Sequence, residues 1–175
     1  MPPSDLHSNP IGYPIANLNA LKQFAKKLAQ QLKPGDVLAL SGDMGAGKTT
    51  LTQAIGRQLG ITEKMTSPTF VLIHDYLSGH LPLVHADLYR LGDSDSESIQ
   101  EELINVIQDK QSLLIVEWAE YGQYLQPFIT LAIHIESPEP EFDSDTQELI
   151  LPETRTLHIT SNDSRFETFS VPSNS

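Results

Sequence analysis

Residues 42–49 read Gly-Asp-Met-Gly-Ala-Gly-Lys-Thr, which fits the pattern G-x-x-x-x-G-K-[ST] of loops that bind phosphate groups. The preceding segment Val37–Leu40 is short and apolar, as a buried parallel strand should be. The following segment Lys48–Leu59 has leucine or isoleucine at every fourth position from Leu51, which indicates a helix. Strand, glycine-rich loop and helix therefore follow in the order that a phosphate-binding loop requires.

The loop has the chemistry that an oligophosphate needs. Unpaired backbone N–H groups at a helix N-terminus replace the hydration shell of the phosphates, and glycines let the backbone approach closely. Lys48 is expected to reach the β- and γ-phosphate oxygens, Thr49 to hold Mg²⁺ through its hydroxyl, and Thr50 to reach the α-phosphate. We therefore predict that the nucleotide is bound by Gly45, Ala46, Gly47, Lys48, Thr49 and Thr50.

Several segments around the loop predict helices and a buried strand. Residues 18–32 carry apolar side chains every three or four positions, which predicts an amphipathic helix. The acidic residues 93–102 predict a solvated loop that leads into a second such helix. Leu113–Val116 is a continuous apolar run, which indicates a central parallel strand covered on both faces.

Other segments have the shorter period of half-exposed strands. Residues 69–76 and 81–87 flank a short turn and predict an antiparallel hairpin, and residues 129–135 and 154–160 alternate polar with apolar side chains. The predicted fold class is therefore an α/β sandwich of the P-loop NTPase type, with a central, mostly parallel sheet, flanking helices and added antiparallel strands. The phosphate site is expected at the carboxyl edge of this sheet.

A length of 175 residues favours one domain, here residues 1–175 with the P-loop in it. The core is expected at about 18–135, followed by an acidic mobile loop at about 136–147, a C-terminal strand, and a disordered tail at about 168–175.

Charge and composition exclude several classes of function. The net charge of -12 opposes unaided binding to nucleic acid, because that binding requires Lys and Arg to neutralise phosphates. No apolar run approaches the roughly 20 residues that span a bilayer, and no export signal is evident, so a cytoplasmic protein without membrane contact is expected. The chain has no cysteine and so no thiolate metal site. His85 and His134 alternate with apolar neighbours and are interpreted as hydrogen-bonded or solvent-facing strand residues rather than metal ligands.

Two acids end predicted strands and are candidates for the nucleotide site. Asp87 and Glu117 can both arrive at the edge where Thr49 lies, one to bind metal and the other to orient water, although either can be an ordinary exposed acid. Trp118, the only tryptophan, either packs near the nucleotide or belongs to the core. Thr69 lies either in a segment that senses the γ-phosphate or in a plain turn.

Four stretches together carry a resemblance to a known family: GDMGAGKTT at 42–50, SPTF at 67–70, HADLYRL at 85–91 and VEWAE at 116–120. Their combination resembles the TsaE family, the bacterial ATPase partner in tRNA threonylcarbamoyladenosine synthesis. The resemblance implies a slow ATPase, dependent on ATP and Mg²⁺, that drives turnover of a complex with TsaB and TsaD. It also implies that tRNA is met only indirectly, through that complex.

The resemblance also implies roles for individual residues. Lys48 and Thr49 would bind phosphate and Mg²⁺, and Glu117 would complete the metal site. Asp87 would be the acid required for hydrolysis, Trp118 would border the nucleotide, and Thr69 would belong to a switch-like catalytic segment.

Two other functions fit a P-loop. A small-molecule kinase uses the same phosphate donor, but such kinases close an arginine-bearing lid, and this chain has only four arginines and no evident basic lid. A nucleotide-dependent binding switch with negligible turnover is the second alternative.

Overall fold

The computed structural model describes residues 11–66, 72–92, 96–138, 141–142, 149–150, 154–166 and 169. Its strands are β1 Ile11–Ile15, β2 Val37–Gly42, β3 Ile73–Tyr76, β4 Leu83–Asp87, β5 Leu113–Glu117, β6 Leu131–Glu136, β7 Glu141–Phe142, β8 Leu149–Ile150 and β9 Arg155–Ser161. Its α-helices are α1 Leu18–Ala29, α2 Lys48–Gln58 and α3 Glu97–Asp109, and its short 3₁₀ helices are η1 Ala119–Tyr121, η2 Gln123–Phe128 and η3 Ser164–Phe166.

One sheet of seven strands organises the described residues, in the order β1-β9-β6-β2-β5-β4-β3. The central strands β6, β2, β5 and β4 run parallel to one another. Antiparallel strands extend both edges, β3 on one side and β9 with β1 on the other. The predicted fold class is confirmed, and β5 occupies the central parallel position expected for its apolar run.

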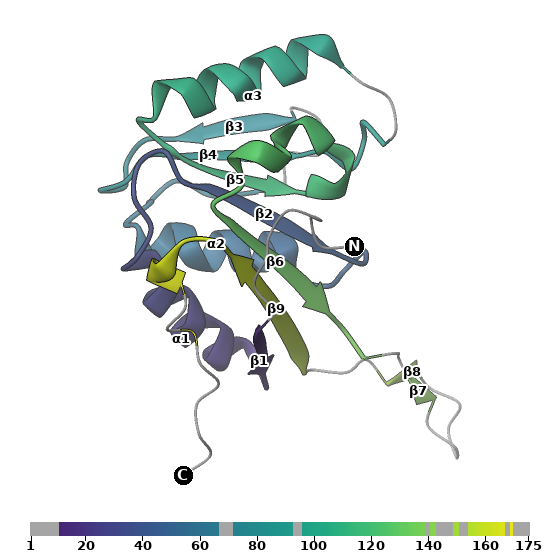
Figure 1. Ribbon diagram of the computed structural model, residues 1–175. Coiled ribbons are helices and arrows are strands. Elements are labelled where there is room, and N and C mark those ends of the chain that lie inside the picture. The colour runs from purple at the N-terminus through teal and green to yellow at the C-terminus, as the bar shows by residue number, and fades with distance from the viewer. Residues whose placement is uncertain are drawn as a thin grey trace.

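The sheet is covered on both faces, as Figure 1 shows: α1 and α2 lie on one side of it and α3 on the other. Side chains of β5 alternate between the two apolar clusters that result. Ile115 packs on the side of α1 and α2, and Val116 packs on the side of α3. Because each such side chain stabilises the fold by about 1.5–3 kcal/mol when fully buried, both faces of β5 favour apolar residues, which explains the unbroken run.

A partly buried ion pair joins η3 to the turn before β2. Arg165 donates to both carboxylate oxygens of Asp36, at 2.8 and 2.9 Å, and to Asp163 at 2.7 Å. It also donates to the backbone carbonyl of Gln31 at 2.7 Å. These bonds raise the pKa of Arg165 above its ordinary value, and they hold β9 in place beside the parallel strands.

Some elements differ from the sequence prediction. Helix α1 ends at Ala29, three residues before the predicted end, and β4 begins at Leu83 rather than at the predicted residue 81. Strand β3 begins at Ile73, and the first part of its predicted range, residues 69–71, lies outside the described residues. Strand β1 and the helices η1 and η2 were not predicted. β1 contains Pro14, which removes a backbone donor, and its position at the edge of the sheet tolerates this loss.

The predicted acidic loop and tail lie largely outside the described residues. Within the described part, Glu141–Phe142 and Leu149–Ile150 pair as a small antiparallel ladder. Among the residues that the structure describes, no helix is long and apolar enough to cross a membrane.

Candidate functional site

The glycine-rich loop between β2 and α2 has the backbone of a phosphate-binding loop. Gly42 has a φ of 133°, and a Cβ atom there would lie 2.4 Å from the carbonyl oxygen of Ile135. Gly47 caps the N-terminus of α2 with a φ of 110°. Both positions therefore require glycine, and the resulting loop presents the N-terminus of α2 to the carboxyl edge of the sheet.

The ammonium of Lys48 is folded back onto this loop. Its Nζ donates to the carbonyl oxygens of Gly42 at 2.6 Å and Asp43 at 2.9 Å. The same atom lies 3.7 Å from the ring centroid of Trp118, a cation–π distance. Burial lowers the pKa of Lys48, while the nearby carboxylates, Glu117 first among them, oppose that shift. The lysine is thus a buried cation placed among groups that favour its charge.

Glu117, at the end of β5, is the most densely bonded side chain of the site. It is 2% exposed. Thr49 Oγ1 donates to its Oε2 at 2.8 Å, and Thr52 Oγ1 lies 3.3 Å from its Oε1. His85 Nε2 lies 2.7 Å from the same Oε1. Helix α2 and strand β4 therefore both fix the orientation of this carboxylate.

Asp87 lies directly beside Glu117, because the two residues are register partners at the ends of parallel strands. Its Oδ1 accepts a hydrogen bond from the backbone N–H of Tyr89 at 3.1 Å. Trp118 has a left-handed backbone with a φ of 56°, which is rare for an aromatic residue, and its ring packs on Tyr89 at 4.9 Å. This strained residue sits where the chain leaves β5, next to both acids.

These residues surround a cavity of about 300 Å³, here called the polar pocket. It is lined by Met44, Gly45, Gly47, Lys48, Thr49, Thr50, Asp87, Tyr89, Glu117 and Trp118.

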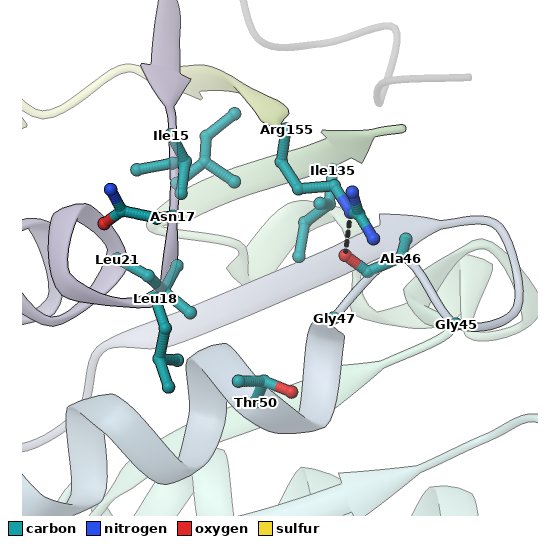
Figure 2. Close-up of a pocket in the computed structure, with 11 residues that line it drawn as sticks. Ile15, Asn17, Leu18, Leu21, Gly45, Ala46, Gly47, Thr50, Ile135 and Arg155 are labelled. Carbon is teal, nitrogen blue, oxygen red and sulfur yellow. Dashed lines mark hydrogen bonds between the residues drawn. The ribbon is translucent and has the colours of Figure 1, made fainter. Parts of the chain in front are cut away.

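A second cavity of about 220 Å³, here called the apolar pocket, lies on the other side of the same loop. Figure 2 shows its lining, which is Ile15, Asn17, Leu18, Leu21, Gly45, Ala46, Gly47, Thr50, Ile135, Arg155 and Leu157. Arg155 Nε donates to the carbonyl oxygen of Ala46 at 3.3 Å, so β9 is tied directly to the loop. Gly45, Gly47 and Thr50 line both pockets, which are therefore neighbours along one loop.

Oxygen ligands suitable for Mg²⁺ are present in the polar pocket. Thr49 Oγ1 and Glu117 Oε2 lie 2.8 Å apart, and hydroxyl and carboxylate oxygens are the ligands that this hard cation takes. In the described part of the chain, no group of three or more acids or histidines forms a metal site by itself. This donor set fits a cation that arrives with phosphates, because Mg²⁺ is commonly held by one or two protein ligands plus phosphate oxygens.

The structure brings most of the predicted site residues together. Lys48, Thr49, Asp87, Glu117 and Trp118 line one pocket, although their roles remain predictions. Ala46 lines the apolar pocket, and Thr50 lies between the two pockets. Thr69 and the rest of its segment lie outside the described residues, so the switch role of Thr69 also remains a prediction.

Three further residues of the site were not predicted: Thr52, His85 and Arg155. Thr52 lies one helical turn after Lys48, and this spacing was a usable signal for a shared helix face. His85 was interpreted only as a hydrogen-bonded or solvent-facing strand residue, and its bond to Glu117 depends on the pairing of β4 with β5. Arg155 reaches the loop through β9, and no local pattern in the sequence indicates that contact.

Comparisons with known proteins agree with this geometry. A family model described as "Threonylcarbamoyl adenosine biosynthesis protein TsaE" matches residues 15–147. A protein from Synechocystis named tRNA threonylcarbamoyladenosine biosynthesis protein TsaE is 41% identical over 116 residues, which are 66% of this chain and 74% of that protein. A protein of the same name from Bacillus subtilis is 45% identical over 103 residues, 59% of this chain and 63% of that protein, so less than two-thirds of its length is matched.

A solved structure is also similar. The crystal structure of YdiB from Bacillus subtilis superposes with a TM-score of 0.66 and 31% sequence identity, and the match covers 92% of each chain. The similarity to that structure therefore extends over most of the chain rather than over the loop alone.

Proposed function

The chain belongs to the TsaE family, and from this premise we propose that it is a Mg²⁺-dependent ATPase that acts with TsaB and TsaD in the threonylcarbamoyladenosine modification of tRNA. One observation carries the ATPase part of the proposal. Lys48, Thr49, Asp87 and Glu117 line a single pocket at the N-terminus of α2, where a triphosphate would be held.

Phosphate binding would use groups that are already in place. Gly45 and residues 47–50 line the polar pocket, and their backbone N–H groups would face the phosphates, while the Ala46 N–H donates to the carbonyl oxygen of Asp43 at 3.1 Å. Lys48 has three N–H donors and gives two of them to loop carbonyls, so one donor remains for a phosphate oxygen before any rearrangement. Release of the loop carbonyls would then free the others.

Hydrolysis would depend on the two acids in different ways. Asp87 would accept a proton from the attacking water. The oxygen of that water would form a bond to the γ-phosphorus while the bond between the γ-phosphorus and the bridging oxygen of ADP breaks. Thr49 and Glu117 would hold Mg²⁺, which when bound neutralises charge on the phosphate oxygens. Trp118 and Tyr89 would shield the reacting groups from bulk water.

The base of the nucleotide would occupy the apolar pocket. Leu18, Leu21 and Leu157 offer aliphatic contacts to a flat aromatic ring, and Arg155 can stack its guanidinium on the ring face. Thr50 lies between the two pockets, so a nucleotide that places its α-phosphate there would reach both of them.

The role in tRNA modification would be exercised through partner proteins. The chain has 23 acids against 11 Lys and Arg, a balance that opposes direct contact with a phosphate backbone. TsaB and TsaD would therefore hold the tRNA, in the cytoplasm, while ATP turnover on this chain drives the cycle of their complex. The described arginines also argue against a kinase, because none of them lines the polar pocket.

Steady-state Mg-ATP hydrolysis tests this function. The rate should be low for the purified chain and should rise when a TsaB–TsaD complex from the same source is added. An unchanged rate, together with phosphoryl transfer to an added metabolite, would contradict the proposal and favour the kinase. Binding of ATP with no turnover under either condition would favour a nucleotide-dependent switch.

A further inference from the structure

A buried histidine contacts the acid that we assign to the metal side of the site. His85 lies in β4, is 1% exposed, and has its Nε2 2.7 Å from Glu117 Oε1. Within the described residues its Nδ1 has no hydrogen-bond partner. Because Nδ1 has nothing to donate to, the network assigns the proton to Nε2, so that His85 donates to the carboxylate.

The bonds to Glu117 make its two oxygens unequal. Oε1 accepts from His85 at 2.7 Å, and it lies 3.3 Å from Thr52 Oγ1, whose single hydrogen is shared with the closer carbonyl oxygen of Lys48 at 3.0 Å. Oε2 accepts only from Thr49 among the hydrogen bonds of the described residues, at 2.8 Å. Oε1 is therefore bonded to His85, which does not line the polar pocket, whereas Oε2 is bonded to Thr49, which does. Oε2 is then the oxygen on the side of the polar pocket, and it keeps a lone-pair site for a further bond.

From this geometry we propose that His85 is a positioning residue for the magnesium–nucleotide site. It acts through Glu117: by occupying Oε1 from the far side, it fixes the carboxylate so that Oε2 lies beside the Thr49 hydroxyl. The inference rests on the proposed function, because it assumes that Glu117 serves the metal. Outer contacts of this kind commonly change metal affinity by about 10–100-fold when they are lost.

Four variants separate positioning from simple core packing. In His85→Gln the side-chain amide nitrogen reaches about as far as Nε2, so the donor is kept; in His85→Asn it ends near the position of Nδ1, so the donor is lost. His85→Leu removes the donor but keeps apolar volume. His158→Leu is a matched control. His158 lies in β9 and lines neither pocket, and its Nε2 also contacts a glutamate oxygen, Glu136 Oε2, at 2.5 Å.

The experiment measures binding rather than turnover. ADP affinity is measured first in EDTA, using the fluorescence of Trp118, the only tryptophan, and Mn²⁺ affinity is then measured on the ADP-bound protein by electron paramagnetic resonance. Thermal unfolding identifies the variants that are folded. We expect similar ADP affinity in EDTA throughout, and Mn²⁺ binding weakened about 10–100-fold in His85→Asn and His85→Leu but close to the parent in His85→Gln and His158→Leu.

Mn²⁺ affinity in folded His85→Asn equal to that of the parent would overturn the inference. Equal weakening in His85→Gln and His85→Asn would also overturn it, because the effect would then not depend on the donor at Nε2. If His85→Leu does not fold, the two amide variants decide the question. If the parent with ADP binds no Mn²⁺, the proposed function itself fails, an outcome distinct from failure of the His85 assignment alone.

Discussion

The polar pocket and the apolar pocket flank the same loop, yet they are built from different halves of the sheet. The polar pocket takes its acids from the carboxyl ends of the parallel strands β4 and β5. The apolar pocket takes its walls from β1, α1, β6 and β9, and two of these, β1 and β9, form the antiparallel extension. Under the proposed function the parallel half would carry the chemistry, while the added strands line the space beside it.

The two pockets would also bind by different forces. In the polar pocket a buried cation faces two acids, so charge-assisted hydrogen bonds dominate there. In the apolar pocket aliphatic side chains dominate, and binding there would come mainly from surface removed from water, at about 25 cal/mol per Å². A substitution in one pocket should therefore change the contribution of that pocket to ligand binding and leave the contribution of the other pocket unchanged.

The largest effect is expected for Lys48→Met. This change removes the buried ammonium and its donors, and Mg-ATP affinity should fall by about 100-fold or more, since a hydrogen bond to a charged group contributes about 1.5–3 kcal/mol and more than one would be lost. Isothermal calorimetry measures the affinity. Lys26→Met, on the exposed face of α1, is the matched control. Equal Mg-ATP affinities in the two variants would contradict the assignment of the polar pocket as the phosphate site.

Asp87→Asn should separate catalysis from binding. The amide keeps an acceptor for the Tyr89 N–H but is no base, so hydrolysis should fall by about 10²–10⁴-fold while ATP affinity stays near that of the parent. Phosphate release under saturating Mg-ATP measures the effect. Asp75→Asn, at an exposed position of β3, should hydrolyse normally. Turnover of Asp87→Asn at the parental rate would contradict the role of Asp87 in hydrolysis and leave Glu117 as the only candidate acid of the site.

A smaller effect is expected in the apolar pocket. Leu18 is 55% exposed at its rim, and Leu18→Ser should weaken ADP binding several-fold, by about 1 kcal/mol. Inorganic tripolyphosphate carries no base, so its affinity should not change. Leu77→Ser, at a site 70% exposed in the turn between β3 and β4, controls for the loss of a surface leucine. Equal weakening for tripolyphosphate would show that the base does not occupy this pocket.

The smallest effect concerns pH and the antiparallel half. Burial lowers the pKa of His134 from 6.5, with His158 acting in the same direction. The unfolded chain therefore binds a proton at higher pH than the folded chain, and this histidine should reduce stability as the pH falls through and below 6.5. His134→Gln should show a smaller loss of melting temperature between pH 7.5 and 5.5. An identical loss in parent and variant would contradict this assignment.

How far the sequence could predict the site depended on how local each part is. The loop from Gly42 to Thr49 is continuous in sequence, so its pattern alone was sufficient to predict a phosphate-binding loop. Asp87 and Glu117 followed from strand ends, because neighbouring parallel strands finish at one edge. The apolar pocket joins residues near 15–21 to residues near 155–157, and only the pairing of β1 with β9 and of β9 with β6 brings those segments together.

The same reasoning explains the parts of the fold that were missed. Helices η1 and η2 have no 3.6-residue period, and η2 includes Pro127, so no helical pattern was visible. His85 alternates with apolar neighbours, which predicts a strand residue but cannot indicate that its side chain meets Glu117 on β5. In both cases the missing information was which segments, distant in the sequence, contact each other in the fold.

The central claim is that the two pockets form one divided nucleotide site. A structure of the chain with Mg²⁺ and a non-hydrolysable ATP analogue tests it most directly. We predict phosphates over the N-terminus of α2, a metal ion beside Thr49 and Glu117, and the base against Leu18 and Arg155. Phosphates bound away from the loop, or a base lying outside the apolar pocket, would contradict it.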